Sequence, residues 1–214
     1  MGEMQAQLER LLGDVGAISR KILRIPNVED VNSAGQADIV NHVYRKLGGV
    51  LPSPLLNLRA GWDIEFDRMA VELDEYLHFN RFRALTLEAP IYIKLAKFPL
   101  ILYRKFCSTY EGRCLQAGGY GGKWSNKSAD SQFGVSSSPK DLSGSGPSRW
   151  KQRAFYDFVK DLSPLVVGVP VVRISIWDEV RESGQKRTVA EVLSRPNRQA
   201  SGRALAQLIR ERAV

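Results

Sequence analysis

The spacing of apolar residues predicts helices near both ends of the chain and in its middle. Apolar side chains recur every three or four residues over 4–24 and 34–47, which is the period of a helix that buries one face. The same period returns over 99–118, 149–162 and 201–214. Each of these stretches is therefore expected to form a helix with one face against the core.

Two stretches have the pattern of strands instead. Residues 62–78 place acids among apolar residues, and a tight turn at Asp67-Arg68 would divide them into two strands. Residues 169–177, VPVVRISIW, form the β-branched run of a buried strand. Because a predicted helix precedes this run, the chain makes an α-to-β step back into the same sheet.

These elements predict an α/β fold, with a small mixed β-sheet flanked by helices in one domain over residues 1–214. Its N-terminal part, residues 1–50, is expected to be helical. Residues 118–148 form an insertion rich in Gly and Ser that is too long for an ordinary connector. It is expected to be either disordered or a functional loop.

The strand pair gathers carboxylates. Side chains alternate along a strand, so Val71 and Leu73 point to one face while Glu72 and Asp74 point to the other. Asp63, from the preceding strand, could complete a cluster of hard oxygen ligands of the kind that binds Mg²⁺ or Mn²⁺. Acids on a strand more often face solvent, but these lie in an apolar run, where a carboxylate without a partner is costly.

This segment resembles the core of the PD-(D/E)XK nucleases, in particular the branch similar to very-short-patch-repair endonucleases. The resemblance rests on Asp63, then Glu72-Leu73-Asp74, then His78, with Asp74 at the usual lysine position. It implies a restriction-endonuclease-like core in which Asp63, Glu72 and Asp74 bind the metal and His78 is a general base or supports the ligands. Asp67 is an alternative to Asp63, but it is expected to face solvent in the turn.

The predicted helix 149–162 has a polar face opposite its apolar stripe. That face carries Arg149, Gln152, Arg153, Tyr156 and Lys160. Gln152 and Tyr156 are similar to a Q-x-x-x-Y pattern of RecB-like nucleases in the same superfamily, and with Arg149 and Arg153 they are candidate nucleic-acid contacts. Lys151 and Arg153 are candidates for the cation missing from the strand, which would stabilise charge on the phosphate or position the attacking water.

The chain is basic, with 31 Lys and Arg against 23 Asp and Glu and a net charge of +8. A basic periphery around an acidic centre suits a metal-dependent nuclease, although a basic surface also serves solubility. Arg81 and Arg83 follow the acids and either contact a phosphate backbone or neutralise the carboxylates.

Within the insertion, Lys123 and Trp124 combine a cation with an aromatic ring. Rings stack on bases and lysines pair with phosphates, so these two residues are candidate nucleic-acid contacts. The alternative is a loop that its aromatic residues fix to the body of the protein.

Other features set limits on the function. No apolar run approaches the ~20 residues of a membrane span, and the acidic N-terminus is unlike a secretory signal, so a cytoplasmic location is expected. Cys107 and Cys114 lie ~10 Å apart on one predicted helix, too far for a disulfide, and are expected to be buried thiols.

The function predicted from the resemblance is metal-dependent hydrolysis of phosphodiester bonds in DNA, with Mg²⁺ or Mn²⁺ as cofactor. The alternative is a non-catalytic nucleic-acid-binding protein on a degenerate nuclease scaffold. Two departures keep it open, the missing strand lysine and Glu75 where a small residue is usual. A homodimer or a partner protein is compatible with either function.

Overall fold

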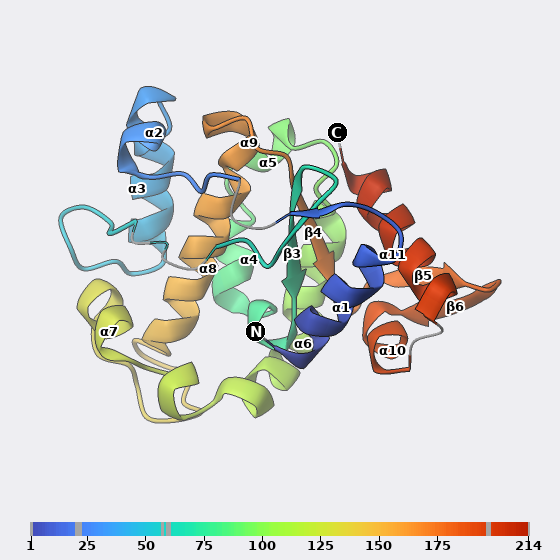
Figure 1. Ribbon diagram of the computed structural model, residues 1–214. Helices are drawn as coiled ribbons and strands as arrows, with labels where there is room; N and C mark the ends of the chain where they lie inside the picture. The colour runs from blue at the N-terminus through green and yellow to red at the C-terminus, as the bar shows by residue number, and fades with distance from the viewer. Residues whose placement is uncertain (1, 20–22, 57, 59–60, 196–197, 214) are drawn as a thin grey trace.

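The computed structural model describes residues 2–19, 23–56, 58, 61–195 and 198–213. It is a mixed α/β protein in which helices lie on both sides of a four-stranded sheet (Figure 1). The helices are α1 (Glu3–Gly13), α2 (Val28–Ser33), α3 (Ala37–Lys46), α4 (Arg81–Thr86), α5 (Ile91–Lys94), α6 (Leu100–Gly118), α7 (Lys127–Phe133), α8 (Ser148–Asp161), α9 (Ser163–Val166), α10 (Val189–Ser194) and α11 (Arg198–Arg212), with short 3-10 helices at Tyr76–His78 and Gly121–Lys123.

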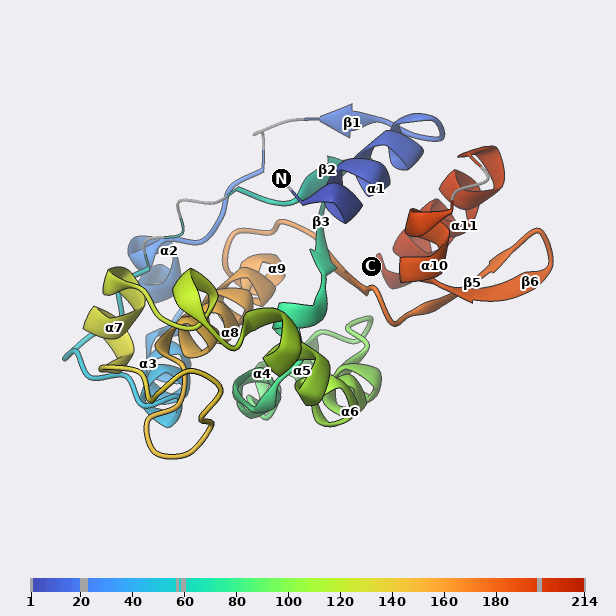
Figure 2. The same ribbon diagram turned by 90° about the horizontal axis from the view of Figure 1, so that it is seen from below.

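The sheet has the order β1-β2-β3-β4. Its first three strands pair antiparallel, and β4 pairs parallel to β3. A separate hairpin, β5 with β6, projects from the body of the molecule (Figure 2). The strands are β1 (Ile18–Ser19), β2 (Ile64–Phe66), β3 (Met69–Asp74), β4 (Val171–Ser175), β5 (Glu179–Glu182) and β6 (Gln185–Thr188).

The predicted strand pair is confirmed, with its turn at the expected place. Asp67 and Arg68 form the two-residue connection between β2 and β3, and both have positive φ, 47° and 65°. Two such residues match the right-handed twist of a hairpin. Asp67 is not fully solvated, because its carboxylate accepts hydrogen bonds from Arg210 Nη2 at 2.7 Å and from the Ala17 backbone N–H.

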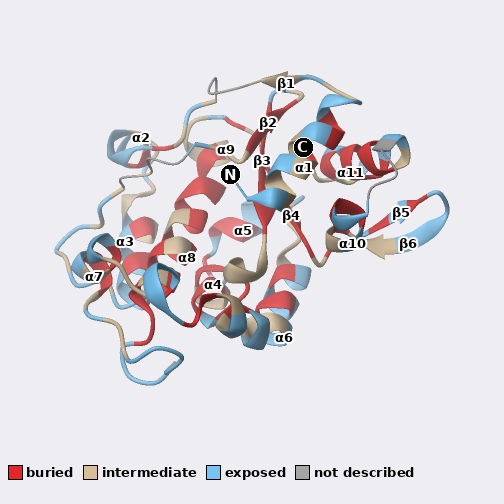
Figure 3. Ribbon diagram, turned by 60° about the horizontal axis from the view of Figure 1, so that its bottom comes forward, coloured by how far each residue is buried: buried red, intermediate tan, exposed pale blue. Residues whose placement is uncertain are grey.

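The two faces of the sheet differ in chemistry. Val71 and Leu73 of β3, with Ile174 of β4, belong to an apolar core shared with α1, α10 and α11. The opposite face carries Glu72 and Arg173, which β3 and β4 place side by side in register. Strand β3 is buried along its whole length (Figure 3), so this polar face is enclosed by protein.

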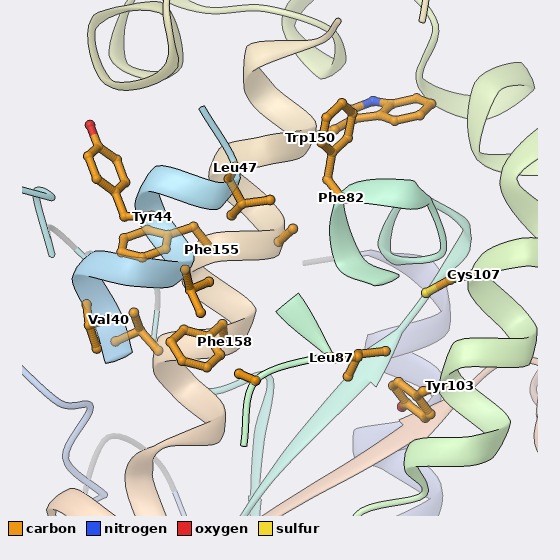
Figure 4. Packing of buried hydrophobic residues seen from close by; sticks show 14 of the residues in the cluster. Val40, Tyr44, Leu47, Phe82, Leu87, Tyr103, Cys107, Trp150, Phe155 and Phe158 are labelled. Atoms are coloured by element: carbon orange, nitrogen blue, oxygen red, sulfur yellow. The ribbon is translucent and has the colours of Figure 1, made fainter. Parts of the chain in front are cut away.

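A second apolar core lies beyond the polar face, among α3, α4, α6 and α8. Three aromatic side chains of α8, Trp150, Phe155 and Phe158, are fully buried in it. Tyr44 of α3 packs against Phe155 with ring centroids 5.3 Å apart (Figure 4). Helix α8 therefore has one aromatic face in this core and one polar face toward the sheet.

The helices predicted over 99–118, 149–162 and 201–214 are confirmed by α6, α8 and α11. The helix predicted over 4–24 was too long. Helix α1 ends at Gly13, and Ile18–Ser19 pairs with β2 as a strand; residues 20–22 lie outside the described part.

The helix predicted over 34–47 is confirmed by α3, which begins at Ala37, a few residues later than expected. A short helix that was not predicted, α2, precedes it, and Gly35 at φ 65° lies between the two. Asn27 begins α2 with a capping box, which satisfies its first backbone N–H groups.

The insertion 118–148 is folded rather than disordered. Helix α7 lies within it, and Trp124 and Phe133 are each 2% exposed. The buried rings of Trp124 and Phe133 therefore fix the insertion to the body of the protein.

No helix in the described part of the chain is long and apolar enough to cross a bilayer.

Candidate functional site

A polar cavity of about 610 Å³ lies between α8 and the end of the sheet where β3 finishes. Asp63, Glu72 and His78 line it from the sheet side. Six residues of α8 line it from the other side, at positions 149, 152, 153, 156, 157 and 160. Their spacing of three and four residues makes them one stripe on the helix surface.

The polar side chains of the stripe are held in place. Arg149 Nη1 donates to Gln152 Oε1 at 2.8 Å, and Gln152 Nε2 donates to Ser128 Oγ at 3.1 Å. The Tyr156 hydroxyl accepts a hydrogen bond from Gln132 Nε2 at 3.1 Å. Because α7 supplies both partners, the insertion orients the predicted Gln152 and Tyr156 pair.

Two of the predicted metal ligands meet in this cavity. The Asp63 backbone N–H donates to Glu72 Oε1 at 3.2 Å, and the Leu73 N–H donates to Asp63 Oδ2 at 3.0 Å. These bonds hold the two carboxylates next to each other. In the described part of the chain no hydrogen bond reaches the second oxygen of either group.

A lysine that sequence reasoning did not select lies beside them. Lys160 Nζ donates to Glu72 Oε1 at 2.7 Å and to the Gly61 carbonyl at 3.1 Å. Burial raises the pKa of Glu72 to about 7, although the Lys160 ammonium acts in the opposite direction. The signal was present, since Lys160 follows Tyr156 by one turn on the polar face of α8.

Asp74, the third predicted metal ligand, does not line the cavity. Its Oδ1 accepts a hydrogen bond from Arg173 Nη1 at 2.7 Å, and both side chains are fully buried. Burial raises the pKa of Asp74, and the Arg173 guanidinium lowers it. Arg173 compensates part of the negative charge of Asp74, while Asp74 Oδ2 is buried without a hydrogen-bond partner in the described part of the chain. The ligand role of Asp74 stays a prediction, but in the cavity only Asp63 and Glu72 of the three predicted ligands are present.

His78 bridges two carboxylates, with Nδ1 2.8 Å from Asp157 Oδ2 and 3.1 Å from Asp74 Oδ1. Burial lowers the pKa of His78, but Asp157 and Asp74 raise it more, so that it lies above its usual value. The two carboxylates therefore favour the protonated form of His78, which argues against the general-base role; support of the ligands, the other expected role, stays a prediction.

The donor atoms of Asp74, His78 and Asp157 lie within 4.8 Å of one another, a spacing that could hold a metal ion. Arg173 donates hydrogen bonds to both carboxylates, however. A divalent cation there would be adjacent to a buried guanidinium, so we interpret the cluster as an ionic network that supports the cavity wall.

Lys151, the predicted catalytic cation, lies away from the cavity. Its Nζ is 5.7 Å from the centre of the Phe82 ring, and burial lowers its pKa. One residue along a helix is a rotation of about 100°, which separates Lys151 from the stripe that contains Gln152.

Two predicted nucleic-acid contacts are engaged in ion pairs. Arg83 is 1% exposed and donates to Asp161 and to the Tyr92 hydroxyl. Arg81 forms a two-pronged pair with Glu111. For Arg83 the second of the two predicted roles, neutralising a carboxylate, is the correct one, because a buried guanidinium cannot contact a phosphate.

Trp124 is also corrected as a nucleic-acid contact. It is buried, its Nε1 donates to the Ser137 carbonyl at 2.8 Å, and its ring packs edge-on against Trp150. Lys123 remains exposed and lines a smaller cavity of about 270 Å³. That cavity shares Asp63, His78 and Arg153 with the larger one.

The remaining donors fit a hard divalent cation. Asp63 and Glu72 each present a carboxylate to a cavity that is large enough for a phosphate group and water. Mg²⁺ is commonly held by one or two carboxylates, with water and substrate phosphate as its other ligands. Asp63 and Glu72 would hold such an ion; no further carboxylate is needed.

The fold and the site define a mixed α/β protein with an acid pair and a buried lysine in a cavity rimmed by arginines. Residues 42–195 match the family model DUF7255, described as a family of unknown function, and the chain belongs to this family. Every cavity residue discussed above falls within that range. No curated protein and no solved structure matches the chain.

Proposed function

We propose that the protein is a metal-dependent nuclease that hydrolyses phosphodiester bonds in DNA. The observation that carries this proposal is the contact of Lys160 Nζ with Glu72 Oε1 at 2.7 Å, beside Asp63. The resemblance to PD-(D/E)XK nucleases implies a site with two carboxylates and a lysine. Here the lysine comes from α8 and reaches the same carboxylate from the helix side.

The topology supports a restriction-endonuclease-like core within this proposal. An antiparallel pair carries the acids, helices α4 to α9 follow in the described chain, and β4 returns parallel to the acidic strand. Among these helices, α8 supplies the lysine and the cationic stripe.

Each group has a separate role in the proposed reaction. A bound Mg²⁺ or Mn²⁺ supplies a water of lowered pKa and positive charge next to the phosphate. Lys160 places a fixed ammonium where negative charge develops, in a site partly shielded from water. Arg149 and Arg153 bind phosphates on either side of the scissile bond, and Gln152 provides an amide for the sugar or base.

The test is cleavage of supercoiled plasmid in the presence of Mn²⁺. Glu72→Gln is expected to abolish cleavage, because it removes a ligand charge without changing the volume of the side chain. Glu65→Gln is the matched control, because Glu65 is a buried acid of the same sheet that does not line the cavity. Equal cleavage by both variants would reject the proposal.

The non-catalytic alternative is favoured by the cationic stripe of α8, since Arg149 and Arg153 can bind phosphates without a metal. A binding protein would retain DNA in a gel-shift assay with Mn²⁺ and leave the plasmid intact. In that case Arg149→Gln and Arg153→Gln would weaken binding, and Glu72→Gln would not.

A further inference from the structure

A second cavity, of about 300 Å³, lies at the other end of the sheet and shares no residue with the candidate site. It opens where β4 begins, between the segment after α5, helix α9 and the end of α11. Figure 1 shows these three elements together along the upper edge of the molecule. This cavity has no part in the proposed nuclease reaction.

The walls of this cavity are mainly apolar. They are formed by Leu95, Phe98, Pro164, Leu165, Pro170 and Val172. The volume is about twice that of a ~150 Å³ apolar cavity that takes up benzene. A well-formed apolar pocket with a few polar groups at its edge is the usual form of a small-molecule site.

Among the described residues of the cavity wall, Asp161 is the only one with a side-chain carboxylate, and its charge is compensated. Its Oδ2 accepts hydrogen bonds from Arg83 Nη2 at 2.7 Å and from the Tyr92 hydroxyl at 2.6 Å. Its Oδ1 accepts one from Arg173. Asp161 therefore neither repels an anion nor requires a cation.

Among the described side chains, the free charge at this cavity is positive. Lys94 and Lys97 both line it and are exposed, and neither has an ion pair or side-chain hydrogen bond in the described part of the chain. Arg212, the third cation, is paired with Asp178 through two hydrogen bonds. An apolar interior with two unpaired lysines at its mouth is complementary to an apolar molecule that ends in an anionic group.

We propose that this cavity binds a small apolar carboxylate, of about two fused rings or an aliphatic chain of similar volume. The apolar part lies against Leu165 and Phe98, and the carboxylate remains at the mouth beside Lys94 and Lys97. The binding is non-covalent, and this proposal does not depend on the proposed nuclease function.

The experiment is isothermal titration calorimetry of the full chain with 2-naphthoate and with its uncharged analogue 2-naphthamide. Saturable binding of one naphthoate is expected, and it should be stronger than that of the amide by about fivefold, which is the effect of exposed charge pairs. No saturable binding at millimolar naphthoate, or equal binding of the two compounds, would overturn the proposal.

Three variants locate the bound compound. Lys94→Gln/Lys97→Gln is expected to remove the preference for naphthoate, whereas Lys105→Gln, an exposed lysine of α6 outside the cavity, should preserve it. Leu165→Trp fills the cavity and should abolish binding of both compounds. Wild-type binding by a folded Leu165→Trp protein would place the compound elsewhere and reject the site; the lysine variants decide the matter if the tryptophan variant does not fold.

Discussion

The contact of Lys160 with Glu72 is the residue-scale feature on which the proposed chemistry depends. Both side chains are buried, at 8% and 3% exposure, and a buried ion pair requires good geometry and further hydrogen bonds. Lys160 has them, because it also donates to the Gly61 carbonyl and lies 5.3 Å from the centre of the Trp62 ring. An ammonium fixed in this way can act on a phosphate without first having to reorganise.

The first prediction concerns that ammonium. Lys160→Met is expected to lower Mn²⁺-dependent plasmid cleavage by at least ~100-fold, the usual cost of one lost charge-stabilising donor. Initial rates of nicking measure it, with Lys105→Met as the control. Lys160→Met also leaves Glu72 without its partner, which can destabilise the fold. The double variant Glu72→Gln/Lys160→Met has neither charge, and the melting temperatures of both variants show whether the fold is preserved. Wild-type rates in folded Lys160→Met protein would exclude the lysine from the reaction.

The second prediction concerns pH and requires no metal. The pKa of Glu72 is about 7 in the folded protein against its ordinary 4.5, so between these values the folded state keeps a proton that the unfolded chain has released. The stability that this proton contributes is fully present below the unfolded pKa and is lost as pH rises through the folded one.

Compared with Glu72→Gln, which does not titrate, wild-type protein is therefore expected to lose about 3 kcal/mol in free energy of unfolding as pH rises from about 4.5 to 7.5. Urea denaturation of both proteins across this range gives the difference. If the difference does not change with pH, Lys160 keeps the carboxylate ionised throughout.

At the scale of elements, α8 joins the core to the site. Its aromatic residues fill the core on one side, and its polar stripe faces the acids of β3 on the other. The hydrophobic period of the sequence predicted both faces of this helix. It did not predict which polar residue would meet Glu72, because that depends on how far along β3 the helix is placed.

The insertion 118–148 gives the third prediction. Trp124→Ala is expected to lower the free energy of unfolding by about 3–5 kcal/mol, since it removes a fully buried ring and leaves the Ser137 carbonyl without its donor. Tyr120→Ala in the same segment should change it by less than about 0.5 kcal/mol, because that ring is 57% exposed. Chemical denaturation compares the two. A stable Trp124→Ala protein with weakened DNA binding would restore the stacking role expected from the sequence.

At the scale of the whole molecule, the layer between the two cores is ionic. Arg173 is fully buried and donates to Asp74, Asp157 and Asp161, so it links β3, β4 and α8. Its three carboxylate partners hold the pKa of Arg173 well above its usual value against the effect of burial. Arg173 thus shares the compensation of these three carboxylates with His78 and Arg83, which also contact them.

The fourth prediction follows from this position. Arg173→Met is expected to lower the free energy of unfolding by about 3–5 kcal/mol, because it leaves buried carboxylates without a cation. Adding Asp74→Asn and Asp161→Asn to the variant should recover part of the loss. Arg181→Met, at an exposed position of β5, is the control and should stay within about 0.5 kcal/mol of wild type. A similar effect of both arginine variants would mean that the buried layer does not depend on Arg173.

The sequence by itself determined the elements whose pattern is local. Helices α6, α8 and α11, the hairpin at Asp67-Arg68 and the alternation of Val71 with Glu72 all follow from the period of apolar residues and from turn geometry. It also determined that Asp63 and Glu72 would be neighbours, because adjacent strands of a hairpin bring them together.

Only the tertiary structure decided which charges are free and which are compensated. Asp74 and Arg83 look like functional residues in the sequence, yet each is buried against a partner 78 or more positions away. Lys160 looks like an ordinary exposed cation, yet it lies 88 positions from the carboxylate that it contacts. The physical reason is that electrostatic pairing depends on distance in space, and a pattern of neighbours along the chain contains no information about it.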